Sequence, residues 1–273
     1  MKITILSNRD LASCVALNHL LPMLSGHSLR IFLSSRVGKK NGPKGPEALD
    51  TLKFVEQDLF NLLMFPLIDR SEQRSADGLL SFKGLERYLD APIDELNDIN
   101  GEGLLKYAET DPDLVLSIRY GVILRDAAIA VPKQGVLNLH SGRLPNYKGV
   151  MATFRALLHG DSELNMTLHT IDDSGIDTGK IIAYSSFPVD LNKSYLWHVL
   201  GLYEGGCRLM ATTAQKILSG DSVQGVEQSS LPEQGEYFTF PTVDELRKFT
   251  DLGFRLVDSD ELADMAGMFM RED

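Results

Sequence analysis

An amide and an imidazole stand two positions apart in the segment Val136-Leu-Asn-Leu-His140. The apolar residues around them are typical of a buried strand, in which residues i and i+2 project from the same face. Asn138 and His140 are therefore expected to point to one place, at the carboxyl end of a strand. In open α/β sheets, that end is where ligands bind. Because an amide can donate to an oxyanion and an imidazole can donate or relay a proton, the pair suits acyl transfer.

A second polar segment, His169-Thr-Ile-Asp-Asp-Ser-Gly-Ile-Asp-Thr-Gly179, follows another apolar strand. A carboxylate such as Asp177 can orient an imidazole, and the three groups together would serve acyl transfer through a tetrahedral intermediate without a covalent enzyme adduct. Taken singly, Asn138 could be a turn former, His140 a core histidine and Asp177 an ordinary loop carboxylate. The ordered combination is what indicates a site. His169 itself is expected to pack within the strand or to support the site.

A sheet of alternating strands and helices must position these side chains. Strands are predicted at residues 3–6, 29–33, 114–118, 135–138, 166–171 and 180–185, with a short extended piece at 237–241. Helices are predicted at residues 11–24, about 47–63, 103–110, 152–158, 194–218 and 242–250. The strand, helix, strand opening and the order that follows predict an α/β fold with a doubly wound, mostly parallel sheet.

Composition places the chain among ordinary globular proteins. The 273 residues are 43% hydrophobic and 24% charged, and no apolar run approaches the ~20 residues that a membrane span needs. The start of the chain lacks the layout of a signal peptide, so a cytoplasmic protein is expected, with no membrane partner. Cys14 and Cys207 stand far apart, which argues against a disulfide scaffold or a cysteine-based zinc site. The net charge of −11 makes nucleic acid a poor partner.

Several common catalytic plans are missing from the sequence. The segment Ser7-Asn-Arg-Asp10, where a dinucleotide-binding fold places its glycine turn, contains no glycine. The chain has no His-Glu-x-x-His, no Cys-x-x-Cys and no Gly-x-Ser-x-Gly motif. We therefore expect neither a nucleotide cofactor nor a metal.

The ordered pattern resembles the folate-dependent formyltransferase family, which includes glycinamide ribonucleotide, methionyl-tRNA, amino-sugar and hydroxyornithine formyltransferases. The resemblance rests on the motif Asn138-x-His140-x-x-x-Leu144-Pro145-x-Tyr147-x-Gly149 and on Ile176-Asp-Thr-Gly179, which follows the strand containing His169. The opening of the chain and the stretch Tyr120-Gly-Val-Ile-Leu124 are compatible with it, so that it extends over roughly residues 1 to 220.

The resemblance implies that 10-formyltetrahydrofolate donates the formyl group and that Asn138, His140 and Asp177 are the catalytic residues. It also implies a folate site formed by two segments, with contacts from Arg119, Tyr120, Gly121, Val122, Ile123, Leu124, Ile171, Asp172 and Asp173. For Arg119 a second interpretation, as a structural ion-pair partner, is equally open. No metal site is implied.

The acceptor implied by the resemblance is a small molecule with an amine or hydroxylamine nitrogen. The missing glycine-rich loop counts against a ribonucleotide acceptor, and the chain ends too soon for the C-terminal domain of the tRNA enzyme. N5-Hydroxyornithine, an acceptor in siderophore biosynthesis, is the leading candidate, and a nucleotide-linked amino sugar is the alternative. A 10-formyltetrahydrofolate hydrolase and a non-catalytic folate-binding protein are the other functions that the same residues could serve.

The predicted organisation is a catalytic domain of the formyltransferase type at residues 1–225, with a helical and loop-rich insertion at about 37–110, followed by a C-terminal extension at 226–273. The insertion, the extension or both are expected to shape the acceptor pocket.

Overall fold

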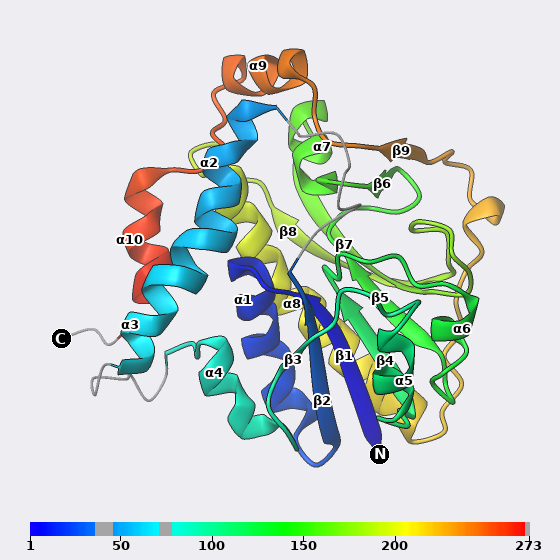
Figure 1. Cartoon of the computed structure of the whole chain (residues 1–273). Coiled ribbons are helices and arrows are strands. Elements are labelled where there is room, and N and C mark those ends of the chain that lie inside the picture. The colour runs from blue at the N-terminus through cyan, green and yellow to red at the C-terminus, as the bar shows by residue number, and fades with distance from the viewer. Residues whose placement is uncertain (36–45, 71–77, 271–273) are drawn as a thin grey trace.

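The computed structural model describes residues 1–35, 46–70 and 78–270, so parts of the predicted insertion lie outside the described residues. A central seven-stranded sheet runs through the molecule in the order β3-β2-β1-β4-β5-β7-β8 (Figure 1). Its strands are β1 (Lys2–Asn8), β2 (Ser28–Ser34), β3 (Asp94–Glu95), β4 (Leu114–Ile118), β5 (Val136–His140), β7 (Glu163–Thr170) and β8 (Ile181–Pro188). A separate pair is formed by β6 (Tyr147–Gly149) and β9 (Glu236–Phe238).

The sheet changes direction at β5. The strands from β3 to β5 are parallel, whereas β7 and β8 are antiparallel to their neighbours. Asn138 pairs with Ser117 on one side and with His169 on the other, and His140 pairs with Thr167. This register places the two predicted polar segments side by side, and it confirms the predicted doubly wound, mostly parallel fold.

Helices cover both faces of the sheet. The helical elements are α1 (Leu11–Leu20), η1 (Leu21–Leu24), η2 (Glu47–Leu49), α2 (Asp50–Lys53), η3 (Phe54–Met64), α3 (Phe65–Arg70), α4 (Phe82–Leu85), η4 (Glu86–Tyr88), α5 (Gly103–Ala108), α6 (Asp126–Ile129), α7 (Ala152–His159), α8 (Tyr195–Leu218), η5 (Gln228–Ser230), α9 (Val243–Asp251) and α10 (Ser259–Gly267). The larger apolar core lies where α1, α7 and α8 pack on one face, and a smaller core lies on the other face under α5 and α6. Burial of apolar side chains on both faces is what holds the parallel strands.

Alternation along β5 decides which face carries the predicted site. Leu137 and Leu139 belong to the larger core, whereas Val136 belongs to the smaller core. Because successive side chains point to opposite faces, Asn138 and His140 lie on the same face as Val136. The site therefore opens on the side of the smaller core.

The described part of the predicted insertion begins with helical residues. Residues 47–70 form one helical run through η2, α2, η3 and α3, and η3 is a π-helix. Further along, β3 pairs in parallel with β2, so the insertion also supplies an edge strand that the sequence pattern did not reveal. A strand of this length has too few residues to show a period of two.

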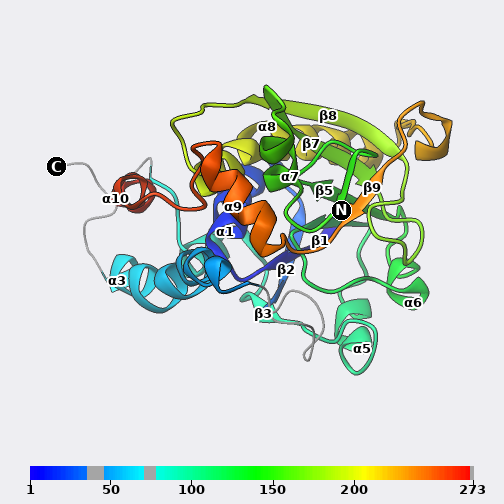
Figure 2. The same ribbon diagram turned by 90° about the horizontal axis from the view of Figure 1, so that it is seen from above.

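The C-terminal extension packs against the rest of the chain. Arg155 of α7 donates to the carbonyl of Thr239 and forms an ion pair with Glu245 of α9, and the rings of Phe154 and Phe249 lie 4.5 Å apart. Figure 1 shows β9 beside β6, and Figure 2 shows α9 next to α7. The boundary between residues 225 and 226 stays a prediction.

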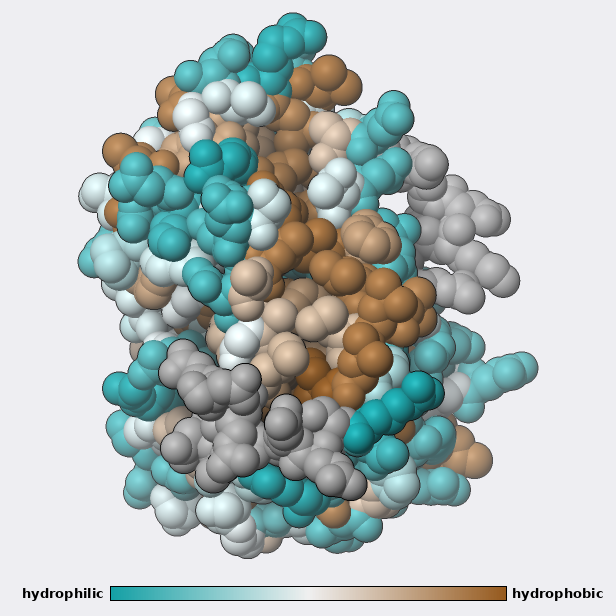
Figure 3. Space-filling view, turned by 90° about the vertical axis from the view of Figure 1, so that its left-hand side faces the viewer, coloured by the Kyte–Doolittle hydropathy of each residue, from teal (hydrophilic) through white to brown (hydrophobic). Residues whose placement is uncertain are grey.

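Exposed apolar side chains gather on the side of the molecule that carries α3 and α10, where Figure 3 shows a brown surface that runs along a hollow. The exposed large apolar residues of η3, of α3 and of the segment that follows α10 are Phe54, Leu62, Leu63, Leu67, Met268 and Met270. In the described ranges, no helix combines the length and apolar character needed to cross a bilayer.

Candidate active site

Asn138 is held by the histidine opposite it in the sheet. Its Nδ2 lies 2.9 Å from Nε2 of His169, and Nδ1 of His169 lies 2.8 Å from the carbonyl oxygen of Thr170. Because a carbonyl only accepts, Nδ1 of His169 carries a hydrogen and Nε2 accepts from the Asn138 amide. This bond uses one of the two hydrogens of the Asn138 amide. His169 thus has the supporting position that the sequence indicated.

His140 has a partner at each ring nitrogen. Its Nε2 lies 2.7 Å from the carbonyl oxygen of Tyr147 and therefore donates to it, while Nδ1 lies 3.5 Å from Oδ2 of Asp177. The side chain of His140 is only 8% exposed. The ring is fixed between a backbone carbonyl and a carboxylate, and the carboxylate side is the one where a proton can be exchanged.

Asp177 is the point where the two polar segments meet. Oδ2 accepts a hydrogen bond of 2.8 Å from the backbone N–H of Gly149, and Oδ1 lies 3.6 Å from Nε2 of His169. Burial alone would raise the pKa of this carboxyl, but His140 and His169 in their protonated forms, together with the Gly149 N–H, outweigh it and lower the pKa to about 2. Asp177 is therefore an anion at neutral pH.

The backbone around Asp177 has a conformation that few residues accept. Asp177 itself lies in the left-handed region with φ of 53°, which Asp tolerates better than most residues. Gly149, with φ of 91°, passes so close to the carbonyl oxygen of Phe238 that no Cβ would fit. The two turns at Gly149 and Asp177 thus bring the Gly149 N–H and the carboxylate together.

The loop after β5 is fixed by neighbouring strands. Thr167 Oγ1 donates to the carbonyl of Gly142 and accepts from the N–H of Leu144, and the hydroxyl of Tyr184 donates to the carbonyl of Leu144. These bonds from β7 and β8 set the path of the chain from His140 to Tyr147. The three predicted catalytic residues are therefore brought together by the sheet register and by this loop.

The two segments predicted to contact folate lie against one apolar cluster. Tyr120, Val122 and Ile171 all pack partly buried on the smaller core, in which Leu124 is itself buried, whereas Ile123 is 53% exposed. Gly121 already donates its N–H to Ser34 Oγ. The carboxylates of Asp172 and Asp173 accept from Thr170 and Thr178 within their own exposed loop. Their contact with a pterin stays a prediction.

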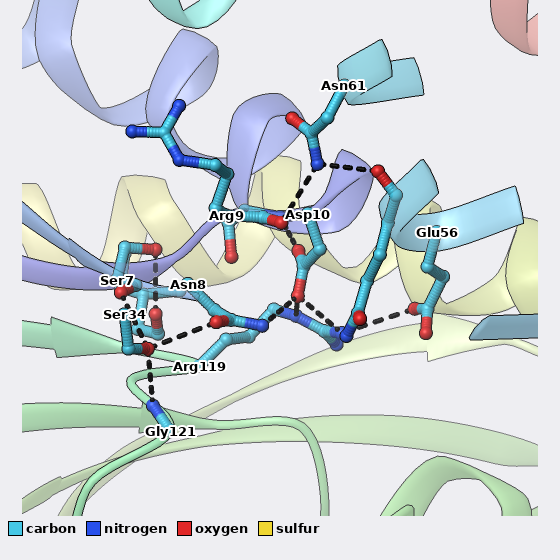
Figure 4. A network of polar contacts seen from close by, with 12 residues as sticks. Ser7, Asn8, Arg9, Asp10, Ser34, Glu56, Asn61, Arg119 and Gly121 are labelled. Carbon is cyan, nitrogen blue, oxygen red and sulfur yellow. Dashed lines mark hydrogen bonds and ion pairs between the residues drawn. The ribbon is translucent and has the colours of Figure 1, made fainter. Parts of the chain in front are cut away.

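The side chain of Arg119 points to two carboxylates, one between β1 and α1 and one in η3 (Figure 4). Its Nε and Nη2 each lie 3.1 Å from Oδ2 of Asp10, and Nη2 lies 3.1 Å from Oε1 of Glu56 in η3. We call these three residues the Arg119 cluster. The geometry gives the ion-pair interpretation of Arg119 a physical basis, and a folate contact of this residue stays a prediction.

The Arg119 cluster joins the insertion to the sheet. Asp10 also caps α1 by accepting from the N–H of Ser13, and it accepts from Asn8, whose Oδ1 in turn accepts from Ser34. Burial raises the pKa of Glu56 to about 7 even though Arg119 opposes the shift, and the nearby Asp10 adds to it. Neither Asp10 nor Glu56 was singled out from the sequence, because their partner Arg119 is remote along the chain.

The cluster borders the predicted catalytic residues. Ile118 pairs with Ser7 of β1 and with Leu139 of β5, so the positions that follow, Arg119 and His140, leave adjacent strands at the same edge. Among the described residues, no group of three histidine, cysteine, aspartate or glutamate side chains is placed to hold a metal ion.

Comparison with known proteins places this geometry in a family context. Residues 92–195 match the formyl transferase family, and this range includes Asn138, His140 and Asp177. Methionyl-tRNA formyltransferase of Legionella pneumophila (strain Corby) is 35% identical over 94 residues, which are 34% of this chain and 30% of that protein. The chain thus matches less than a third of the length of that relative.

Solved structures share the fold at low sequence identity. The N-formyltransferase from Helicobacter canadensis, solved with folinic acid and dTDP-3-aminofucose, has a TM-score of 0.53 and 18% identity, over 87% of this chain and 71% of that one. Glycinamide ribonucleotide transformylase 1 from Symbiobacterium toebii has a TM-score of 0.54 and 15% identity, over 83% of this chain and 94% of that one.

Proposed function

Because the chain contains a formyl transferase domain and has the formyltransferase fold, we propose that it transfers a formyl group from 10-formyltetrahydrofolate to a nitrogen of a small-molecule acceptor. The observation that carries the proposal is the meeting of Asn138, His140 and Asp177, from two segments of the chain, at one edge of the sheet. These are the residue types that acyl transfer to nitrogen needs.

The apolar cluster under residues 120–124 and Ile171 fits the donor. A flat ring could lie against the backbone there, with the half-buried Val122 and the exposed Ile123 beside it. When bound, 10-formyltetrahydrofolate supplies the formyl group, and the chain has to orient it and stabilise the charge that develops on its oxygen.

Asn138 is the proposed oxyanion donor. His169 takes one hydrogen of the Asn138 amide and so leaves the other directed at the developing charge. Such a pre-oriented donor costs no rearrangement at the moment of reaction. We assign His140 the same role; its Nε2, which donates to the carbonyl of Tyr147 in the free protein, has to turn from that carbonyl to reach the oxyanion.

His140 and Asp177 also move the proton. The acceptor nitrogen must lose a hydrogen as its bond to the formyl carbon forms, and the leaving nitrogen of the donor must gain one. The anionic Asp177, 3.5 Å from His140 Nδ1, holds the ring and takes the hydrogen from the acceptor nitrogen directly or through water, and this hydrogen is then passed to the leaving nitrogen of the donor.

The Arg119 cluster favours a cationic or zwitterionic acceptor. It places two carboxyl groups beside one guanidinium at the edge next to His140, and the whole chain carries a net charge of −11. The net charge attracts an ammonium group and repels a dianionic nucleotide, and Glu56, whose pKa is about 7, adds a negative charge to the cluster as it ionises. The leading acceptor is therefore N5-hydroxyornithine, which would place the protein in siderophore biosynthesis.

A nucleotide-linked amino sugar is the second candidate acceptor. It is favoured by the shared fold of enzymes such as the one solved with dTDP-3-aminofucose, which covers most of this chain. The two candidates differ in charge, so Glu56 should discriminate them.

A panel of acceptors tests the proposal. Formation of tetrahydrofolate is followed with hydroxyornithine, ornithine, two sugar nucleotides, glycinamide ribonucleotide and initiator methionyl-tRNA. We expect hydroxyornithine to be preferred, and Glu56→Gln to raise its KM while Glu47→Gln, an exposed acid in the same helical run, leaves KM unchanged. Preference for a sugar nucleotide would overturn the ranking, and preference for either of the last two acceptors would refute the small-acceptor proposal.

A further inference from the structure

A glutamine of the C-terminal extension is bonded to the backbone that carries Asp177. The Nε2 atom of Gln228 lies 2.8 Å from the carbonyl oxygen of Asp177 and 2.8 Å from that of Gly179. A side-chain amide has two hydrogens, so each carbonyl receives one. Gln228 is only 7% exposed, which makes these bonds the means by which two shielded carbonyls are satisfied.

The position of Gln228 is fixed by a short backbone bridge. Val226 and Ile181 exchange two hydrogen bonds, of 2.9 Å from the Ile181 N–H and 2.8 Å from the Val226 N–H. Gln228 follows two residues later and begins η5. The ion pair between Glu227 and Lys180 is exposed and adds little. The bridge therefore fixes the position of Gln228 next to the turn formed by residues 177–179.

The loop that receives Gln228 has a conformation that needs such support. Asp177 is left-handed, and Gly179 lies so close to the carbonyl of Thr170 that a Cβ would clash. A residue in a sparsely populated conformation persists only where surrounding contacts determine it. The amide of Gln228 spans the chain from Asp177 to Gly179 and so fixes the turn from which the carboxylate projects.

The same extension also supports the other side of the site. Strand β9 pairs with β6, Val150 donates its N–H to the carbonyl of Phe238, and Glu236 donates to that of Asn146. Strand β6 contains the Tyr147 carbonyl that faces His140 and the Gly149 N–H that binds Asp177. Residues 226–238 thus contact both chain segments that meet at the carboxylate.

We propose that Gln228 is a positioning residue, which aims the Asp177 carboxylate at His140 by donating both of its amide hydrogens to the Asp177–Gly179 turn. The C-terminal extension then contributes a positioning residue to the active site. The catalytic consequence rests on the proposed function, whereas the effect on Asp177 itself does not.

Gln228→Met tests this inference, because methionine has nearly the same length and no N–H. The matched control is Gln215→Met on α8, whose amide donates to the carbonyl of Met23 away from the site. The Asp177 carboxyl is titrated by NMR in the folded protein, and kcat and the acceptor KM are measured. We expect the pKa of Asp177 to rise in Gln228→Met, with a fall in kcat of about 100-fold and an acceptor KM unchanged within about twofold. The control should keep both wild-type values.

Gln228→Glu serves if the methionine variant does not fold, because glutamate keeps the shape and, when ionised, cannot donate. A wild-type Asp177 titration and a wild-type kcat in a folded Gln228 variant would overturn the inference. Absence of formyl transfer by the wild-type protein would refute the proposed function instead, and the NMR titration would still decide whether Gln228 positions Asp177.

Discussion

Oδ2 of Asp177 lies 3.5 Å from Nδ1 of His140 and also accepts a hydrogen bond from the backbone N–H of Gly149. The carboxylate therefore links the loop after β7 to the loop after β5, and the ring of His140 is held between them. This relationship gives the site a fixed proton partner at one nitrogen of the imidazole.

Replacing Asn138, His140 or Asp177 should slow formyl transfer strongly. The effects of combined replacements should not add. Asn138→Ala removes the proposed oxyanion donor and should lower the rate by about 100- to 1000-fold. His140→Ala and Asp177→Ala should each lower it comparably, and the double variants should be little worse than the single ones because all three act on one transition state. Steady-state kinetics on variants with wild-type circular dichroism checks this. A rate above about a tenth of wild type in His140→Ala would show that the roles are assigned wrongly.

Ionised Asp177 should stabilise the folded protein, and this stabilisation should be lost at acidic pH. Its pKa in the folded state is about 2, below the ordinary value of about 3.9. The stabilisation is therefore fully present above the ordinary value and is lost as pH falls through the folded value; its size is about 2 kcal/mol. Urea unfolding of wild type and Asp177→Asn should give a difference in unfolding free energy that is constant near neutral pH and shrinks below pH of about 4. A difference independent of pH would contradict the ion-pair geometry.

His169 should affect catalysis through the orientation of Asn138. His169→Ala leaves the Asn138 amide free to turn, and we expect a loss of roughly 10- to 100-fold in kcat. His169→Gln, which offers an acceptor oxygen to the same amide, should recover part of that loss. His19→Ala on α1, away from the site, is the matched control. Equal activity of the alanine and glutamine variants would mean that His169 only fills space.

Glu56 should make stability fall as pH rises towards neutral. Its pKa in the folded state is about 7, above the ordinary value of about 4.3. Between these values the unfolded chain releases a proton that the folded chain keeps, so the free energy of unfolding decreases with rising pH and levels off above about pH 7. Glu56→Gln lacks this titration, and its stability relative to wild type should increase across that range. Parallel pH profiles of the two proteins would show that Glu56 is not buried as described.

Much of the fold could be predicted from the sequence because the strands are long apolar runs. β4 was predicted with its observed ends, and β5 was predicted at 135–138 but continues to His140. The difference matters, since His140 pairs with Thr167 inside the sheet instead of following the strand. A polar residue ends an apolar pattern even where backbone pairing continues, so pattern alone stops the strand too early.

The contacts around the site were harder to predict because they join residues remote along the chain. The motif gave Asn138, His140 and Asp177, but nothing local marks Gln228 as a partner of Asp177 or Glu56 as a partner of Arg119. Strand β3 and helix α10 were also missed, the first because it is too short to show alternation and the second because its sequence mixes acidic and apolar residues. Tertiary packing decides such elements more than intrinsic propensity does.

The most direct test of formyl transfer is to measure both products with and without acceptor. Wild-type protein is incubated with 10-formyltetrahydrofolate, and tetrahydrofolate and formylated acceptor are quantified by mass spectrometry. We predict equal amounts of the two products with hydroxyornithine, little tetrahydrofolate without an acceptor, and formation of both products at least about 100-fold slower with His140→Ala. Tetrahydrofolate and free formate in equal amounts, whether or not an acceptor is present, would contradict the account and identify a hydrolase.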